Sequence, residues 1–334
     1  MKNGNRKRGE ESLNGSILRL FHEKKGGVVS GEETSIALGV SRTAVWKHIN
    51  ALRGLGYKIE SLPSRGYRLL AAPDLIISEE ISTGLRSKRI GINIVCLGET
   101  GSTNEDAYKL AEEGALEGTV VFAESQFRGK GRLGRRWESP QGVNLYCSII
   151  LRPPIPPVRA FQMTFLSSVA VARAIISTTS LNPFIKWPND LIINNRKVAG
   201  LLNEMSGETD KINFIILGIG VNINMSSPQF PEGLRHPASS LFLESGRPVK
   251  RTDFAKVLME ELDRLYDSYL SHGFAPVREE WLSLCNSVDR EVMVAFHDQR
   301  IRGTAKGIDN EGALLVQLPE GKTERVLAGD VTVL

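Results

Sequence analysis

The apolar positions near the start of the chain recur at helical spacing. Three helices are predicted there, the second after Ser30 and the third after Ser41, because serine side chains cap helix N-termini. In the third helix Val45, Ile49 and Leu52 fall at i, i+4 and i+7, which places them on one buried stripe. A short glycine-containing turn separates the second and third helices, and this arrangement is the helix-turn-helix pattern.

The next segment changes from helical spacing to strands. Residues 57–70 predict two strands around a turn at Pro63–Gly66, so a hairpin follows the helix-turn-helix. That combination is a winged helix, and we assign it to a first domain at residues 12–72. Pro73 interrupts the pattern and marks the boundary.

Strands and helices mix beyond this boundary. Strands are predicted at residues 92–97, 119–126, 144–151, 184–186, 191–193, 197–205 and 212–219, and helices at residues 103–113, 161–178, 252–272 and 275–285. The strands come mostly in hairpins, so we expect a mixed or antiparallel sheet in a second domain at residues 73–285. Short strands with glycine-containing turns then predict a small barrel at residues 286–334. The expected fold class is α+β with several domains.

Composition narrows the class of protein. Of the 334 residues, 41% are hydrophobic and 24% are charged, and no window reaches the ~18 uninterrupted apolar residues of a membrane helix. The charged N-terminus has no apolar stretch behind it, so it does not resemble a secretory signal. Three cysteines lie far apart without metal-ligand spacing. We therefore expect a reduced, cytoplasmic protein without a membrane contact.

Charge is spread unevenly along the chain. Residues 1–70 carry 13 Lys and Arg against 6 Asp and Glu, although the net charge of the whole chain is only +4. A basic unit on a slightly acidic body favours a nucleic-acid contact at one end of the chain. A solvated basic surface is the alternative.

The densest candidate for chemistry is the loop QFRGKGRLGRRW at residues 126–137. Gly129, Gly131 and Gly134 allow backbone amides to approach an anion, and five cations suit phosphates. The glycines satisfy GxGxxG, but the segment runs into Pro140 instead of opening a helix, and the GKS/T ending of a P-loop is missing. We interpret the loop as a phosphate-binding element, with a basic surface turn as the alternative.

A second candidate lies between two predicted strands. Lys186 is followed by a turn that presents the amide of Asn189 and the carboxylate of Asp190 together. Lys197 comes eleven residues after Lys186, so two hairpins could bring both lysines to one side of the sheet. Two cations there would suit an anionic intermediate. A well-formed hairpin with surface lysines is the alternative.

Two further segments combine short polar side chains with glycines. The strand end GIGVN leads to Asn222, whose amide could recognise the edge of a base, although a structural strand end explains it equally well. Ser102 and Thr103 precede a predicted helix, where they could cap it or, with Asn104, bind a small polar ring. The chain has no nucleophile triad, and its five histidines show no metal-ligand spacing.

Taken in order, the segments STN, GKGRLGRRW, KWPND, RKVAGLL and GIGVNIN resemble those of the biotin–protein ligase family, in particular the bifunctional ligases that also repress the biotin operon. The resemblance covers residues 14–334. It implies a central sheet related to class II aminoacyl-tRNA synthetases, between an N-terminal winged helix and a C-terminal SH3-like barrel. It also implies ATP and biotin as substrates, Mg²⁺ held mainly by the ATP phosphates, and a homodimer.

The family implies a reaction in two steps. The biotin carboxylate attacks the α-phosphate of ATP to give biotinyl-5′-adenylate and pyrophosphate, and a lysine of a biotin carboxyl carrier protein then displaces AMP. Positioning and charge stabilisation carry such chemistry, which agrees with the lack of a nucleophile triad. The adenylate would also act as corepressor on the operator DNA of biotin genes, with the loop at residues 126–137 ordering on it and favouring the dimer.

The resemblance assigns roles to the candidate residues. Those implied to bind biotin are Ser102, Thr103, Asn104, Gln126, Lys130, Gly131, Arg132 and Lys197. Those implied at the phosphates are Lys186, Arg132, Gly129 and Gly134, and those implied at adenine and ATP are Trp137, Asn189, Asp190 and Asn222. The family usually has arginine in place of Lys130, and lysine keeps the charge but loses the bidentate fork. We expect this position to act mainly through its backbone.

The winged helix implies a second set of contacts. The start of the second helix of a helix-turn-helix meets base edges in the major groove. The implied DNA contacts are therefore Ser41, Arg42, Thr43, Trp46 and Lys47, with His48 and Arg65 as further candidates. A winged helix kept only for packing is the alternative.

Three other functions use parts of the same pattern. A ligand sensor without turnover would lose the catalytic cations, yet Lys186 and Lys197 are both present. A lipoate ligase shares the catalytic fold but usually lacks this combination of winged helix and barrel. A ligase whose N-terminal domain only regulates catalysis would not bind DNA.

Overall fold

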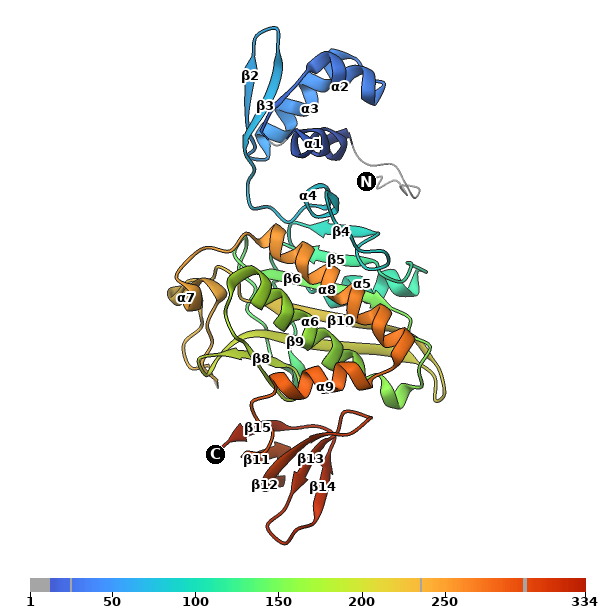
Figure 1. Cartoon of the computed structure of the whole chain (residues 1–334), viewed down its shortest axis with the longest axis vertical. Coiled ribbons are helices and arrows are strands. Elements are labelled where there is room, and N and C mark those ends of the chain that lie inside the picture. Colours follow the sequence, from blue (N-terminus) through green and yellow to red (C-terminus); the bar gives the residue numbers. More distant parts are fainter. Residues whose placement is uncertain (1–12, 25, 235, 297–298) are drawn as a thin grey trace. The chain divides into compact units, whose positions relative to one another are not determined.

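The computed structural model describes residues 13–24, 26–234, 236–296 and 299–334, and the chain divides into two compact units, one ending at Gly84 and one beginning at Leu85 (Figure 1). Residue 12, the start of the first predicted domain, lies outside the described residues. The second unit contains both the central sheet and the C-terminal strands.

The first unit is a winged helix, as predicted. Its helices are α1 (Leu13–Glu23), α2 (Gly31–Leu38) and α3 (Arg42–Gly54), and its strands are β1 (Val28–Val29), β2 (Lys58–Leu62) and β3 (Gly66–Ala71), in the sheet order β1-β3-β2. The Ser41 hydroxyl accepts from the Ala44 N–H and caps α3. Val45, Ile49 and Leu52 are buried in one core, so the predicted stripe of α3 is confirmed.

A short helix after the wing was not predicted. α4 (Ser78–Ser82) lies beyond Pro73 and packs against α1. The Tyr57 hydroxyl donates to the buried Glu80 carboxylate at 2.6 Å, which ties α4 to the winged helix. The compact unit therefore runs past the predicted limit near Pro73, because five residues are too few to show a helical period.

The second unit is built on a mixed sheet of seven strands. Its order is β4-β5-β6-β10-β9-β8-β7, and the β4–β5 pair is parallel whereas the other pairs are antiparallel. The strands are β4 (Ile94–Leu97), β5 (Val120–Ala123), β6 (Leu145–Leu151), β7 (Phe184–Lys186), β8 (Asp190–Ile193), β9 (Arg196–Gly207) and β10 (Ile212–Val221). The expected mixed sheet is confirmed.

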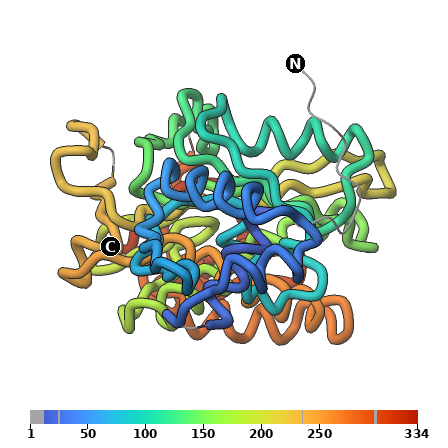
Figure 2. The backbone as a smooth tube through the Cα atoms, turned by 90° about the horizontal axis from the view of Figure 1, so that it is seen from above, coloured from blue at the N-terminus to red at the C-terminus, as the bar shows by residue number. Residues whose placement is uncertain are grey.

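Helices cover both faces of this sheet. α5 (Thr103–Glu112) packs on one face, where Ala107 and Ala111 meet Val121 and Ile216. Figures 1 and 2 show α6 (Gln162–Thr179) and α8 (Arg251–His272) on the other face. The remaining helices are α7 (Leu241–Ser245) and α9 (Ala275–Leu284). Because α5 covers only one face, the sheet residues that point toward α5 all lie on that same face.

Within the described part of the chain, one helix is apolar enough to cross a membrane by length and composition alone. It is α6 with the turn before it, Pro157–Thr179, and 72% of its apolar window is buried inside the structure. A helix that is apolar on all sides and buried is a core helix of a globular protein. Its position between the sheet and α8 agrees with that explanation.

The C-terminal strands, predicted as a small barrel, form an antiparallel sheet of five strands. The strands are β11 (Glu291–Phe296), β12 (Gln299–Ile308), β13 (Leu314–Gln317), β14 (Thr323–Val326) and β15 (Asp330–Val333). They pair in the order β14-β13-β12-β11-β15. The Trp187 indole N–H donates to the Gly312 carbonyl oxygen at 3.3 Å, so this sheet is attached to the turn between β7 and β8.

Candidate active site

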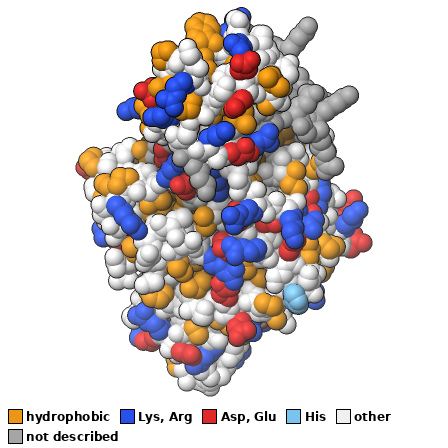
Figure 3. Space-filling model, turned by 45° about the horizontal axis from the view of Figure 1, so that its top comes forward, with side chains coloured by type: hydrophobic (Ala, Val, Ile, Leu, Met, Phe, Trp, Pro, Cys, Tyr) orange, Lys and Arg blue, Asp and Glu red, His pale blue; other side chains and the backbone are white. Residues whose placement is uncertain are grey.

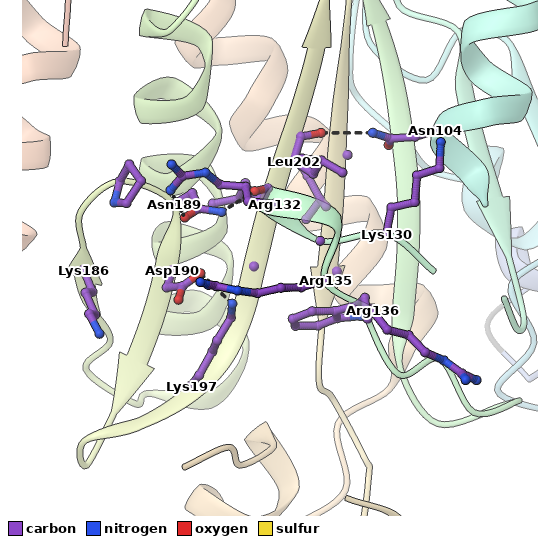
Figure 4. A pocket seen from close by; sticks show the side chains of 18 of the residues that line it. Asn104, Lys130, Arg132, Arg135, Arg136, Lys186, Asn189, Asp190, Lys197 and Leu202 are labelled. Carbon is purple, nitrogen blue, oxygen red and sulfur yellow. Dashed lines mark hydrogen bonds and ion pairs between the residues drawn. The ribbon is translucent and has the colours of Figure 1, made fainter. Parts of the chain in front are cut away.

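A pocket opens on the α5 side of the central sheet, bordered by the loop at residues 126–137 (Figure 4). Twelve residues named from the sequence line it: Ser102, Thr103, Asn104, Gln126, Lys130, Gly131, Arg132, Trp137, Lys186, Asn189, Asp190 and Lys197. They come from four separate segments of the chain. The fold therefore gathers most of the candidate chemistry in one place.

Glycines in the sheet leave room for two large side chains of the pocket. A Cβ atom at Gly220 would lie 2.7 Å from the Trp137 indole, and one at Gly200, its register partner on β9, would lie 3.0 Å from the same ring. A Cβ atom at Gly218 would collide with the Asn104 amide. The glycines therefore make room for Trp137 and Asn104, which both line the pocket.

The loop at residues 126–137 is held by backbone hydrogen bonds at both ends. At its start the Arg128 N–H donates to the Gly101 carbonyl oxygen at 3.0 Å. Near its end the Trp137 N–H donates to the Gly129 carbonyl oxygen at 2.9 Å. The loop therefore closes on itself as a small hairpin.

Two arginines of the loop reach polar groups on other elements. Arg132 donates to Asn189 Oδ1 at 3.1 Å, and burial lowers the pKa of its guanidinium, an effect that Asp190 opposes. Arg135 donates to the two carboxylate oxygens of Asp330 on β15 at 2.6 and 3.3 Å. The C-terminal sheet therefore contributes a carboxylate to the edge of the pocket.

Lys130, at a position where the resemblance implies an arginine, forms an ion pair with α5. Its Nζ lies 2.9 Å from Glu105 Oε1, and Arg128 Nη2 lies 3.5 Å from the other carboxylate oxygen. The hydrogen bond from Lys130 holds the pKa of Glu105 below its usual value. The side chain at position 130 is thus engaged with Glu105 beside the biotin-site candidates Ser102 and Thr103.

Asp190 lies between the two lysines predicted to share one site (Figure 4). Lys197 Nζ is 2.6 Å from the Asp190 carboxylate and 5.3 Å from the centroid of the Trp137 ring. Lys186 is the register partner of Asp190 across β7 and β8 and lines the same pocket. Two lysines and Arg132 around one carboxylate leave an excess of positive charge, which suits a phosphate.

The floor of the pocket consists of short polar side chains: Thr103, Asn104, Gln126 and, beneath them, Ser148 on β6. Ser102 occupies the N-cap position of α5 but makes no side-chain cap hydrogen bond, so capping does not use its hydroxyl. Gln126 Oε1 instead accepts the Thr103 N–H at 2.9 Å. The Gln126 side chain, and not the Ser102 hydroxyl, therefore accepts a free N–H group at the start of α5.

A second, more apolar pocket adjoins the first at Trp137. Phe230, Met225 and His236 are among its walls. Asn222, the predicted base contact, also lines this pocket, but its amide nitrogen donates to the Ser239 carbonyl oxygen at 3.0 Å. An apolar pocket beside a cationic one can hold a base and its phosphates together.

Two predicted phosphate contacts do not line the first pocket. Gly129 lies where a Cβ atom would be 2.8 Å from Ser139 Oγ, so it allows the loop to pack. Gly134 stands at the exposed loop tip with φ of +71°, a value that favours glycine. Sequence reasoning missed Glu105, Asp330 and Ser148; of these, Ser148 had a signal, since it is polar within the apolar strand LYCSIIL.

The described residues contain no group of three or more His, Cys, Asp and Glu that could hold a metal ion. Asp190 supplies a carboxylate on the phosphate side of the pocket. Mg²⁺ keeps several waters and is usually bound through one or two carboxylates together with substrate phosphates. The residues present fit a metal ion that arrives with ATP, and Asp190 is the residue that would supply a protein ligand.

The predicted DNA contacts lie mostly on an exposed surface of the first unit. Those exposed are Ser41, Arg42, Thr43, Trp46 and Lys47 at the start of α3, and Arg65 at the tip of the β2–β3 hairpin. His48 is half-buried, and its Nδ1 lies 2.8 Å from Asn14 Oδ1 on α1, so it faces the protein.

Acidic side chains accompany many of the basic ones. On the face shown in Figure 3, Lys and Arg side chains lie next to Asp and Glu side chains. In the first unit Arg42 Nη2 lies 2.6 Å from Glu32 Oε2, with both side chains largely exposed. A phosphate that approaches Arg42 would therefore exchange one anionic partner for another.

Comparison with known proteins matches three consecutive segments to families. Residues 16–68 match the HTH domain, residues 98–222 match the Biotin/lipoate A/B protein ligase family, and residues 288–334 match the Biotin protein ligase C terminal domain. The middle segment contains the loop, the two lysines and the strand pair of the pocket.

Relatives of similar length extend the match to nearly the whole chain. The chain is 37% identical over 320 residues to the Bifunctional ligase/repressor BirA of Bacillus spizizenii, covering 96% of this chain and 98% of that protein. It is 33% identical to the protein of the same name from Escherichia coli, over 91% of this chain and 92% of that one. These matches include the winged helix.

A solved structure covers most of the chain. The biotin protein ligase from Aquifex aeolicus in complex with biotin and ATP superimposes with a TM-score of 0.63 at 27% identity, covering 72% of this chain and 98% of that chain. From the order of its domains, the pocket and these matches, the chain belongs to the biotin protein ligase family, in the group of bifunctional ligase/repressors.

Proposed function

We propose that this protein ligates biotin to a lysine of a biotin carboxyl carrier protein, through biotinyl-5′-adenylate, with ATP as the energy source. The observation that carries the proposal is the convergence of Lys186, Lys197 and Arg132 around one pocket whose opposite end is neutral and polar. A carboxylic acid with a polar ring fits the neutral end. Its carboxylate then lies among the cations that would also hold the phosphates of ATP.

The chemistry follows from this charge distribution. A biotin carboxylate oxygen attacks the α-phosphorus, the bond to the pyrophosphate breaks, and pyrophosphate leaves. The neutral amine of the carrier lysine then attacks the acyl carbon, AMP leaves, and the nitrogen loses its proton to water. Lys186 and Arg132 stabilise the phosphoryl charge in the first step, and Lys197 faces the carboxylate end; such preorganised charges account for much of the rate enhancement of enzymes. Mg²⁺, when bound with ATP, neutralises phosphate charge.

The ligase activity is tested by following the mass of a carrier domain. The protein is incubated with ATP, Mg²⁺, biotin and a biotin carboxyl carrier domain, and we expect a biotin-dependent mass gain on the carrier lysine. Lys186→Ala should abolish this gain, and Lys211→Ala, at an exposed position near the β9–β10 turn, is the matched control. If folded wild-type protein binds biotin but never modifies the carrier, it is a sensor and not a ligase.

The first unit supports a second activity, repression of biotin genes. The exposed start of α3 and the tip of the β2–β3 hairpin together suit a major-groove contact with flanking backbone contacts. We propose that a homodimer carrying the adenylate binds the operator, as a cytoplasmic repressor. Footprinting on the promoter of a biotin-synthesis gene should show adenylate-dependent protection. Equal dimer fractions with and without adenylate, measured by sedimentation, would contradict the corepressor role.

A further inference from the structure

A row of hydrogen bonds crosses the sheet under the floor of the pocket. Ser148 on β6, Gly218 on β10 and Leu202 on β9 are register partners across three adjacent strands. Asn104 lies over Gly218, where any Cβ atom would displace it. Its amide therefore reaches Ser148 on one side, and Leu202 and Glu204 on the other.

The direction of the Asn104 amide is determined by its neighbours. A backbone carbonyl oxygen only accepts hydrogen bonds, so the atom that faces the Leu202 oxygen at 3.1 Å is Nδ2. The same nitrogen donates to Glu204 Oε2 at 2.7 Å. The amide oxygen must then face Ser148 Oγ, 2.6 Å away, and it accepts the Ser148 proton.

The next bond follows from the number of protons. Ser148 has one hydroxyl proton, and Asn104 takes it, so Ser148 can only accept from Thr103 Oγ1, which lies 2.8 Å away. Thr103 has a second contact to Gln126 Oε1, but it is longer, at 3.2 Å, and that oxygen already accepts the Thr103 N–H. Thr103 therefore donates toward Ser148, and its lone pairs remain for a donor in the pocket.

Burial prevents this direction from reversing. Ser148 is 0% exposed, and Thr103 and Asn104 are each 4% exposed. If the hydrogen bonds ran in the opposite direction, two acceptors or two donors would face each other, and no water could replace the lost bond. An unsatisfied buried polar group costs more than an ordinary hydrogen bond contributes.

We propose that Ser148 is a positioning residue, which makes Thr103 a hydrogen-bond acceptor and thereby selects an acid whose ring offers an N–H group. This inference rests on the proposed function, because the ureido ring of biotin carries N–H groups whereas the dithiolane ring of lipoate carries none. A site built to pair a substrate N–H discriminates strongly against an analogue that lacks it. Ser148 thus separates biotin from lipoate without touching either.

The first test is Ser148→Ala, with pyrophosphate release measured at varied biotin, lipoate and ATP. Thr103 then loses the acceptor that fixes its proton, so the proton can turn toward the pocket and oppose the N–H groups of biotin. We expect the KM for biotin to rise by about 10-fold or more, with kcat and the KM for ATP changed by less than about 3-fold. The ratio of kcat/KM for biotin to kcat/KM for lipoate should decrease. Ser167→Ala is the matched control, because Ser167 is also fully buried but bonds only within α6.

The second test separates positioning from a merely structural role. Asn104→Leu removes the acceptor of the Ser148 proton, which then turns to Thr103 and converts Thr103 into a donor. We expect a larger rise in the KM for biotin than for Ser148→Ala. Adding Ser148→Ala to Asn104→Leu should lower the KM again, because the misdirected proton is gone. A structural role predicts the opposite, namely a double variant worse than either single one.

The outcomes distinguish this inference from the proposed function. If wild-type protein releases no pyrophosphate with biotin and ATP, the proposed function fails and the inference fails with it. If wild-type protein is active, a KM for biotin within about 2-fold of wild type in Ser148→Ala overturns the inference alone. The inference is also overturned if the increases in the KM for biotin caused by Ser148→Ala and Asn104→Leu add in the double variant. Biotin affinities from calorimetry should follow the KM values.

Discussion

The rim and the floor of the pocket are made of opposite kinds of polar group. The rim consists of long cations: Lys130, Arg132, Arg135, Lys186 and Lys197. Contacts of Lys130, Arg132, Arg135 and Lys197 join the loop or β9 to other elements. On the floor, Thr103, Asn104 and Ser148 are short neutral side chains that are nearly inaccessible to solvent. Rim contacts can exchange one anion for another, whereas floor contacts cannot change direction.

This difference separates two tasks. The Lys130–Glu105 and Arg135–Asp330 pairs are partly exposed, so their net energies are small and a phosphate can compete for the cations. The floor hydrogen bonds are dry, so each determines whether its neighbour donates or accepts. The rim therefore supplies charge for the reaction, and the floor supplies direction for recognition.

The largest expected effect tests the rim. Lys186→Ala removes a cation that would stabilise the phosphoryl transition state, and we expect the rate of adenylate formation to fall by about 10²- to 10³-fold. The affinity for biotin should change little, because the ring contacts lie at the other end of the pocket. Rapid-quench measurement of adenylate, with calorimetry for biotin, gives both quantities. If the affinity for biotin fell by the same factor as the rate of adenylate formation, the rim would not be separate from the floor in function.

The next effect tests the floor. Gly218→Ala inserts a Cβ atom where the Asn104 amide lies, so we expect a rise of about 10-fold or more in the KM for biotin and a loss of about 1–3 kcal/mol in the free energy of unfolding. Urea unfolding and steady-state kinetics measure the two. Gly98→Ala is the matched control, because no atom lies within 4 Å of its added Cβ atom. A tolerated Gly218→Ala would mean that Asn104 is not tightly held.

A smaller effect concerns the contact between rim and C-terminal sheet. Asp330→Asn weakens the two bonds to Arg135, and we expect the KM for ATP to change by about 2- to 5-fold. The change should shrink at higher ionic strength, because salt screens partly exposed pairs. Asp289→Asn, which breaks an exposed pair with Lys306, is the control. A salt-independent loss would indicate that Asp330 acts by packing and not by charge.

The smallest effect is a dependence of stability on pH. Lys130 lowers the pKa of Glu105 in the folded protein, so this pair stabilises the fold above the ordinary carboxyl pKa and loses its effect as pH falls through the lowered value. Glu105→Gln should therefore lose less than about 1 kcal/mol at neutral pH, since the pair is 40% exposed. The difference from wild type should vanish in acid. A difference that grows as pH falls would have the wrong sign for this pair.

Most of the secondary structure could be predicted from the sequence. The helices α5, α6, α8 and α9 and the seven strands of the central sheet begin and end within a few residues of the predicted limits. The short α4 and α7 escaped prediction, because five residues do not complete two helical turns. Most candidate site residues also came from local motifs, since glycines, cations and turn residues stand together in the loop and in KWPND.

The partners of those residues could not be predicted in the same way. Nothing near Arg135 indicates Asp330, which is 195 positions away, and nothing near Asn104 indicates Ser148 or Glu204, which are 44 and 100 positions away. From the sequence, Lys130 could only be compared with the arginine that the resemblance implies there. The structure shows its side chain paired with Glu105 on a different element. Asn222 was expected to bind a base, although its amide nitrogen is bonded to Ser239.

The sequence by itself determined the elements of this protein, their order and the family to which it belongs. Caps, turns, hydrophobic periods and short motifs depend on residues a few positions apart, so their physics is visible along the chain. Tertiary structure alone decided which cation meets which carboxylate and in which direction the floor hydrogen bonds run. These depend on strand register, which places Ser148, Gly218 and Leu202 side by side, and on burial, which removes the water that would otherwise let each group choose its own partner.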